Sequence, residues 1–123
     1  MQTSARVVII GGGIMGASLL YHLAELGWTD CLLIEKDELT SGSTWHAAGN
    51  LPTFSTSWSI LKLQKYSAAL YRKLAASAEN PINYHLTGSV RLAHGRNRMD
   101  EFHHVKSMAK ANGLEYEILS PSE

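Results

Sequence analysis

The stretch Arg6–Asn50 reads RVVIIGGGIMGASLLYHLAELGWTDCLLIEKDELTSGSTWHAAGN and decides the fold. Its apolar run Val7–Ile10 is typical of a strand buried on both faces. A helical pattern over Ile14–Leu26, with Gly27 as its stop, leads to a second strand over Asp30–Glu35. Between the first strand and the helix stand three glycines at GxGxxG spacing: Gly11, Gly13 and Gly16. This order of strand, glycine turn, helix, strand and acid predicts a dinucleotide-binding unit.

Each glycine of the turn has a separate physical purpose. Gly11 allows the tight turn out of the strand, and Gly13, which has no β-carbon, lets a pyrophosphate approach the backbone. Gly16 lets the helix lie against the strand. The helix N-terminus then offers unpaired N–H groups and a positive dipole end to the phosphates. The alternative is a glycine-rich turn that binds no ligand.

The acid of the pattern is Glu35, which follows Gly11 by 24 positions. A carboxylate at the end of the second strand can accept hydrogen bonds from the hydroxyls of a ribose. Its negative charge also repels a 2′-phosphate, so NADP is disfavoured. We therefore expect the ADP half of an adenine dinucleotide to bind here.

The composition fits one ordinary soluble domain and excludes several classes of partner. Of 123 residues, 45% are hydrophobic and 18% charged, and the formal net charge is zero. A neutral chain gives no sign of nucleic acid or an anionic membrane as partner, and no apolar stretch approaches the roughly 20 residues of a membrane helix. The single cysteine, Cys31, excludes an internal disulfide and fits a reducing compartment, so we expect a cytoplasmic protein.

The later part of the chain predicts a long helix over Ser57–Ser77. On the first helix, the residues expected to face the sheet include Ala17, Leu20 and Ala24. On the long helix, one apolar stripe is expected from Ile60, Leu63, Ser67, Leu70 and Leu74. A solvated face is expected from Lys62, Lys65, Arg72 and Lys73.

Beyond a break at Asn80–Pro81, the order of elements no longer follows the strand–helix unit. A helix is expected over Arg96–Asn112, with Met99, Phe102, Val105 and Met108 at helical spacing and Gly113 as its stop. Short strands are expected at Tyr84–His85, Gly88–His94 and Glu115–Leu119. We therefore divide the chain into residues 1–80, the N-terminal part of a cofactor-binding domain, and residues 81–123, the beginning of an α+β substrate domain.

The final residues, Ser120-Pro121-Ser122-Glu123, have the pattern of a helix N-terminus: a Ser cap, Pro at the first helical position and Glu three residues after the cap. A helix start without a helix predicts that these residues belong to a longer enzyme. The alternative is a true chain end with a polar tail.

With the loop SGSTWHAAGN the chain resembles a known family, and the likeness spans nearly the whole chain: the flavin-dependent dehydrogenases of N-methylated glycines (dimethylglycine and sarcosine dehydrogenases) within the D-amino-acid-oxidase superfamily. The matching stretches are VVIIGGGIMGAS, LLIEKDELTSGSTWHAAG and, more loosely, TGSVRLAHGRNRMDEF and LEYEILSPSE. The string TWHAAG is the most specific part. The resemblance implies an α/β fold with a Rossmann-like FAD-binding βαβ unit and a truncated second domain.

The resemblance implies that His46 carries FAD covalently, through the 8α-methyl carbon of its ring. It also places Ile14 and Met15 at the pyrophosphate turn, and Glu35 with Lys36 at the adenosine ribose. Trp45 is expected to pack beside the flavin or to fill the core. The loop expected to run along the cofactor consists of Gly42, Ser43, Thr44, Trp45, His46, Ala47, Ala48, Gly49 and Asn50.

The resemblance further implies an FAD-dependent amine dehydrogenase that removes an N-methyl group from dimethylglycine or sarcosine. Hydride would pass from the N-methyl carbon to flavin N5, and water or tetrahydrofolate would take the one-carbon unit. Electrons would leave to an electron-transfer flavoprotein or to oxygen. A eukaryotic member would work in the mitochondrial matrix.

Residues beyond the cofactor motif support no further assignment. No catalytic acid, base or substrate clamp can be named, and the histidines show no metal-ligand spacing, so no metal is expected. Two other functions stay open. The chain could be a non-catalytic fragment that acts as an interaction module, or an NAD-binding module, since the glycine turn and Glu35 do not distinguish NAD from FAD.

Overall fold

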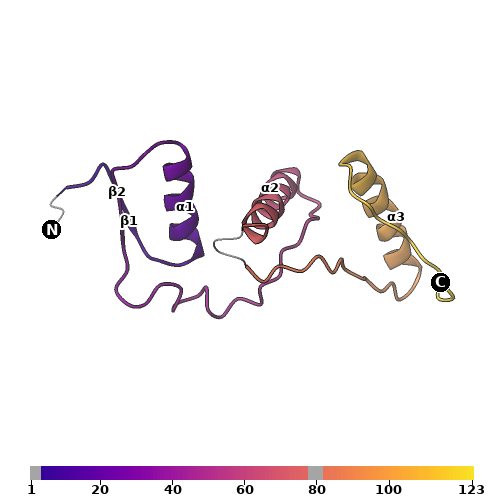
Figure 1. The fold of residues 1–123 in the computed structure, drawn as a ribbon. Coiled ribbons are helices and arrows are strands. Elements are labelled where there is room, and N and C mark those ends of the chain that lie inside the picture. Colours follow the sequence, from indigo (N-terminus) through magenta and orange to yellow (C-terminus); the bar gives the residue numbers. More distant parts are fainter. Residues whose placement is uncertain (1–3, 78–81) are drawn as a thin grey trace. The chain divides into compact units, whose positions relative to one another are not determined.

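The structure is a computed structural model that describes residues 4–77 and 82–123. The chain divides into two compact units, Met1–Asn50 and Leu51–Glu123 (Figure 1). The break expected at Asn80–Pro81 lies outside the described residues. The domain boundary expected between residues 80 and 81 falls within the second unit and stays a prediction.

The first unit is the expected strand–helix–strand unit. Strand β1 (Val7–Ile10) is followed by helix α1 (Ile14–Glu25) and strand β2 (Cys31–Ile34), and the two strands pair in parallel from Val7 opposite Cys31 to Ile10 opposite Ile34. Parallel pairing requires a crossover, which α1 supplies beside the strands (Figure 1, indigo). The expected α/β class is therefore confirmed, with element ends within one residue of expectation.

Helix α1 packs on the two strands through a row of its residues that differs from the expected row. Leu20 is half-buried, as predicted, and Gly16 and Leu23 share its side of the helix. Ala17 and Ala24 were expected to face the sheet, and this was wrong, because both are exposed. A sheet of two strands is narrow, so it covers only the row closest to β1 and β2.

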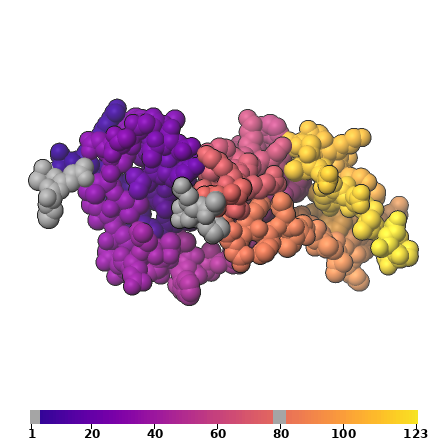
Figure 2. Space-filling view, viewed as in Figure 1, coloured from indigo at the N-terminus to yellow at the C-terminus, as the bar shows by residue number. Residues whose placement is uncertain are grey.

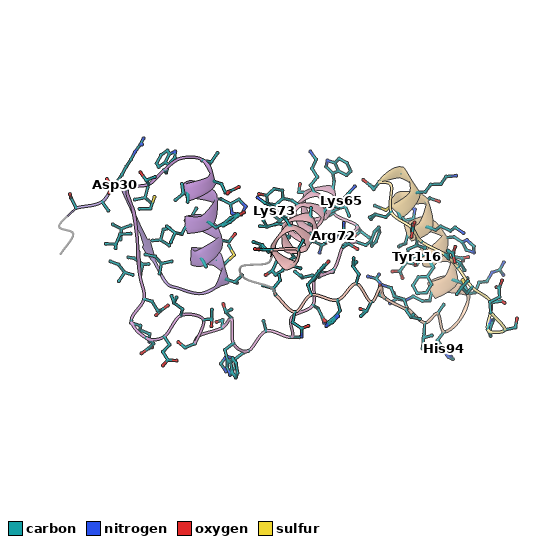
Figure 3. The ribbon with its side chains drawn as sticks, in the orientation of Figure 1. Asp30, Lys65, Arg72, Lys73, His94 and Tyr116 are labelled. Atoms are coloured by element: carbon teal, nitrogen blue, oxygen red, sulfur yellow. The ribbon has the colours of Figure 1, made fainter. Side chains whose placement is uncertain are left out.

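The second unit contains helix α2 (Trp58–Ala75) and helix α3 (Arg96–Ala111). The helix of the sequence prediction is confirmed in α2, and its apolar stripe is confirmed in part, because Ser67, Leu70 and Leu74 are half-buried. Leu61 and Ala68 are buried, whereas Ile60 and Leu63 are exposed. Apolar residues occupy more than one row of this helix, and the chain packed against it decides which row is covered. The expected cations on the solvated face are exposed, as Lys65, Arg72 and Lys73 illustrate (Figure 3).

Helix α3 matches its sequence pattern closely. Phe102 and Val105 are buried, Met99 and Met108 are half-buried, and Ala109 is fully covered. The helix ends before Gly113, whose φ of +66° is a left-handed conformation that favours glycine. The Lys65 ammonium of α2 donates a hydrogen bond of 3.0 Å to the Asn112 carbonyl oxygen, next to this helix end.

The three short strands expected at Tyr84–His85, Gly88–His94 and Glu115–Leu119 do not form in the described residues. These segments lack the regular backbone pairing that defines a strand, and the side chains of Val90 and Leu92 are 90% and 88% exposed. The orange segment that contains them lies at the surface in the view of Figure 2. Alternation along one segment predicts a strand, but the strand exists only where a second segment pairs with its N–H and C=O groups.

Among the helices of the described residues, none combines the length and apolar character that crossing a bilayer requires.

The glycine turn supplies the first testable prediction. A methyl group at Gly16 would overlap the carbonyl oxygen of Gly11, a backbone atom that cannot move without opening the turn. We expect Gly16→Ala to lower the free energy of unfolding of this unit by about 1–3 kcal/mol, the usual cost of overpacking. Urea unfolding of the cofactor-free protein, followed by circular dichroism, measures the change.

Gly42→Ala is the matched control. A methyl group at Gly42 meets no atom within 4 Å, and its φ is not left-handed, so its unfolding curve should stay within about 0.5 kcal/mol of the parent. Equal curves for the two variants would show that Gly16 does not hold α1 against the turn.

Candidate cofactor-binding site

The glycine turn lies where the sequence placed it, between the end of β1 and the start of α1. The Gly11 N–H donates to the Ile34 carbonyl oxygen at 2.8 Å, which continues the parallel pairing into the turn. Gly11 has a φ of +108°, so a side chain there would be strained. Gly13 caps α1 with an extended backbone and no side chain, and the N–H groups of the first helical turn have no acceptor within the helix.

Glu35 reaches the turn from the end of β2. Its Oε2 accepts the Gly12 N–H at 2.6 Å, and its Oε1 accepts the N–H groups of Lys36 at 2.7 Å and Asp37 at 3.2 Å. Three backbone amides therefore fix one carboxylate at the edge of the glycine turn. The expectation that this acid and the turn share one end of the sheet is confirmed.

The same amides alter the titration of Glu35. The Gly12 N–H, followed by those of Asp37 and Lys36, holds the pKa of the Glu35 carboxyl below the ordinary glutamate value of 4.5. Partial burial opposes this effect, and the Lys36 charge adds slightly to it. The group is therefore an anion across the neutral range, with oxygen lone pairs left over for the hydroxyls of a ribose.

Asp30 lies at the opposite end of β2 from Glu35 and therefore away from the glycine turn (Figure 3). Its Oδ2 accepts the Arg6 N–H at 3.0 Å, before β1 begins. Two acids thus bracket β2, and only Glu35 lies at the glycine turn. Lys36, the expected partner of Glu35 at the ribose, follows it in an exposed position, with its ammonium 3.5 Å from Asp37 Oδ2.

The loop after β2 folds back onto the turn through two hydrogen bonds. The Thr40 N–H donates to the Gly12 carbonyl oxygen at 3.1 Å, and the Ile14 N–H donates to Thr44 Oγ1 at 2.9 Å. The second bond satisfies the first amide of α1 with a side chain from 30 residues further along the chain. The loop that carries the expected cofactor contacts is therefore attached to the glycine turn.

His46 lies in a series of turns that spans residues 39–46. Its Nδ1 is 3.1 Å from the Gly42 carbonyl oxygen. A carbonyl oxygen only accepts, so in the neutral ring this bond requires the proton on Nδ1 and leaves the lone pair of Nε2 available. His46 and Trp45 are both exposed, and Trp45 therefore does not fill the core of its unit.

The remaining expected site residues lie around the same turn. Ile14 and Met15 are exposed at the start of α1, 50% and 82% respectively. Exposed residues of the loop are Gly42, Ser43, Ala47, Ala48, Gly49 and Asn50. Thr44 is half-buried. Contact of these residues with a cofactor stays a prediction.

Gly12 is a residue of this site that sequence reasoning missed. Its N–H meets Glu35, its carbonyl oxygen meets Thr40, and a methyl group there would lie 3.1 Å from the Glu35 Cβ. The signal was present, because the chain has three consecutive glycines where the dinucleotide pattern requires only the first and third. The middle one is needed for the close approach of the β2 end.

Other chemistry-bearing groups do not join this site. The Cys31 thiol is half-buried and lies 3.4 Å from the Trp28 carbonyl oxygen, which suits a structural residue. Within residues 4–77 and 82–123, no three His, Cys, Asp or Glu side chains are grouped so that they could hold a metal ion. A groove of about 660 Å³ in the second unit runs between residues 88–93 and 115–121, near Tyr116 (Figure 3), and none of the expected site residues lines it.

Comparison with known proteins places the chain among flavin enzymes. The family model described as FAD dependent oxidoreductase matches residues 6–123. Rattus norvegicus mitochondrial dimethylglycine dehydrogenase is 41% identical over 119 residues, which are 97% of this chain and 14% of the relative. Homo sapiens mitochondrial sarcosine dehydrogenase is 37% identical over 124 residues, which are 100% of this chain and 14% of the relative.

Two further similarities complete the comparison. The mitochondrial pyruvate dehydrogenase phosphatase regulatory subunit of Mus musculus is 38% identical over 123 residues, which are 100% of this chain and 14% of that protein. Among solved structures, glycine oxidase from Bacillus cereus ATCC 14579 superposes with a TM-score of 0.66 at 27% sequence identity. The superposition covers 89% of this chain and 32% of the glycine oxidase chain. The chain thus spans 14% of the length of these curated relatives.

The glycine turn, the carboxylate fixed beneath it and the family match over residues 6–123 agree with one another. The chain belongs to the family of FAD-dependent oxidoreductases.

Proposed function

We propose that these residues form the N-terminal cofactor-binding part of an enzyme that oxidatively demethylates a methylated glycine such as dimethylglycine or sarcosine. One observation carries the proposal: the loop with His46 is bonded back onto the glycine turn in a chain similar to dehydrogenases of both compounds. The substrate-binding groups would be supplied by sequence outside these residues. Alone, the chain is expected to bind FAD weakly and to turn over nothing.

The residues present fit the ADP half of FAD. The glycine turn exposes bare backbone, since Gly13 has no side chain and a methyl group there would lie only 2.9 Å from Thr44 Oγ1. The N–H groups of Met15 and Gly16 begin α1, where a phosphate is favoured by the helix dipole. Glu35 would accept the ribose hydroxyls. When bound, FAD supplies the hydride-accepting ring, and the protein contributes position and charge.

His46 is the proposed point of covalent attachment. The Gly42 carbonyl oxygen orders its ring and favours the neutral tautomer with the proton on Nδ1, so Nε2 is the nucleophilic atom. Its exposure in this chain leaves the atom accessible to a flavin ring. An attached flavin cannot dissociate, which suits a site whose phosphate contacts are mostly backbone amides.

The partners follow from the same proposal. The substrate is a small N-methyl amine, water or tetrahydrofolate takes the one-carbon unit, and an electron-transfer flavoprotein or oxygen accepts the electrons. Both dehydrogenase relatives are named mitochondrial, so a eukaryotic protein of this kind would work in the mitochondrial matrix. A bacterial one would be cytoplasmic.

A second candidate function has a specific observation in its favour. A regulatory subunit is as similar to this chain as the sarcosine dehydrogenase is, so the same fold could serve a non-catalytic, interacting protein. Assay of the full-length protein with dimethylglycine, sarcosine and an artificial electron acceptor separates the two. Bound flavin without turnover of either amine would support the regulatory function, and acid-released NAD without flavin would support an NAD-binding module.

We predict that His46→Ala in the full-length protein abolishes acid-stable flavin and leaves FAD bound non-covalently, because only the Nε2 bond is removed. In-gel flavin fluorescence after denaturation measures the attachment, and circular dichroism shows that the fold is retained. His103→Ala, an exposed histidine on α3, is the control and should keep the fluorescent band. A fluorescent band in the His46 variant would place the attachment elsewhere.

We predict that Glu35→Gln weakens non-covalent FAD binding about tenfold, equivalent to about 1.4 kcal/mol, when measured in the His46→Ala background. A glutamine has one acceptor oxygen, so it cannot serve both Gly12 and the amides of Lys36 and Asp37. Fluorescence titration with FAD gives the Kd. The control is Glu38→Gln, an exposed acid of the same loop, and a Kd equal in both variants would remove Glu35 from the site.

The pH dependence of this contribution follows from the lowered pKa of Glu35. A carboxyl whose pKa is lower in the folded protein stabilises the turn fully above its ordinary value of 4.5. That stabilisation disappears as the pH falls through the lower, folded value. We therefore expect the difference in Kd between the Glu35 parent and Glu35→Gln to be constant from pH 8 to about 5 and to shrink only in more acidic buffer.

A further inference from the structure

We propose that Thr44 is a positioning residue for the covalent attachment of the flavin, an inference that rests on the proposed function of His46. By accepting the Ile14 N–H, the Thr44 hydroxyl holds the His46 loop in register with the phosphate-binding turn. The alternative is that the hydroxyl contacts phosphate or ribityl oxygens of the cofactor directly.

The Thr44 hydroxyl packs closely against the backbone of the glycine turn. Thr44 Oγ1 lies 2.9 Å from the Ile14 nitrogen and 2.9 Å from the position that a β-carbon on Gly13 would take. Only a glycine at position 13 therefore admits the hydroxyl. Thr44 is half-buried, whereas every other residue of the loop from Ser41 to Asn50 is exposed. It is the one side chain of this loop segment that packs inward.

Short-range hydrogen bonds hold Thr44 and His46 in one series of turns. The Trp45 N–H is shared between the carbonyl oxygens of Thr40 and Gly42, both at 3.1 Å, and the His46 N–H donates to Ser43 at 3.2 Å. The Thr40 N–H, bonded to the Gly12 carbonyl oxygen, gives the loop a second anchor on the same turn. The imidazole, itself bonded to Gly42, therefore belongs to the same series of turns as Thr44, and its position depends on where that series is attached to the glycine turn.

Attachment depends on this register because the two reacting atoms, His46 Nε2 and the flavin C8α, must both be held in position. The Nε2–C8α bond forms while one C8α–H bond and the imidazole N–H bond break, and both hydrogens, with the electron pair, end on the flavin as its two-electron-reduced form. Molecular oxygen or the enzyme's own electron acceptor then reoxidises it. A nucleophile displaced by about 1 Å from its productive position costs roughly 100-fold in rate.

Positioning and direct phosphate contact predict different results for Thr44→Val, which keeps the shape and removes the hydroxyl. If Thr44 positions the loop, the variant frees the Ile14 amide for a phosphate, so non-covalent FAD affinity is kept while attachment slows. If Thr44 binds the phosphate, the variant loses non-covalent affinity as well. The two measurements together therefore separate the roles.

The experiment uses cofactor-free full-length protein incubated with FAD, and it follows acid-stable flavin with time. We expect Thr44→Val to slow attachment about 10- to 100-fold. Thr44→Ser, which restores the hydroxyl, should stay close to the parent rate, and so should Thr29→Val, a matched exchange at an exposed threonine of the same unit. The Kd for FAD, measured with Thr44→Val in the His46→Ala background, should change less than about threefold.

A second readout does not require flavin at all. Hydrogen exchange of the Ile14 amide in the cofactor-free protein should rise at least about tenfold in Thr44→Val, because its acceptor is lost. Attachment at the parent rate in Thr44→Val, or unchanged exchange at Ile14, would overturn the proposal. A parent protein that binds FAD but forms no acid-stable flavin would instead overturn the proposed role of His46, and with it any part of Thr44 in attachment.

Discussion

The Glu35 carboxylate joins the end of β2 to the glycine turn, and the first unit depends on this contact. Its 2.6 Å hydrogen bond from Gly12 spans 23 residues and brings together the two ends of the strand–helix–strand unit that a dinucleotide needs. The amides of Lys36 and Asp37 hold the same carboxylate from the other side. One anion thus fixes the turn, and it is the group we propose for the ribose.

The turn also organises the loop that follows β2. Gly12 offers its N–H to Glu35 and its carbonyl oxygen to Thr40, and the first amide of α1 goes to Thr44. Residues that would contact opposite ends of a long cofactor are therefore hydrogen-bonded to the same short stretch of backbone, the glycine turn and the start of α1. This arrangement explains Gly12 and Gly13, where a β-carbon would lie 2.5 Å from Leu39 Cδ2 and 2.9 Å from Thr44 Oγ1 respectively. Gly11 meets no such neighbour and is favoured instead by its φ of +108°.

In the second unit, the extended segments do not pair into the strands that the sequence predicts. Its helix α3 has a covered apolar face, yet the extended segments 88–94 and 115–119 form no ladder within the described residues and border an open groove. Val90 and Leu92 alternate as a strand would, but they are exposed. The chain spans 14% of the length of its curated relatives, and the first unit is the part in which the expected strand–helix–strand unit forms.

The sequence by itself determined β1, the turn, α1, β2 and the position of Glu35, because glycine backbone freedom and short-range periodicity act between near neighbours. It also determined the covered face of α3. Only the tertiary structure decided that Leu61 rather than Ile60 is buried in α2, that Gly12 receives Glu35, and that Thr44 caps α1 from 30 residues away. These outcomes depend on which distant segment packs against each residue, and no local pattern encodes that partner.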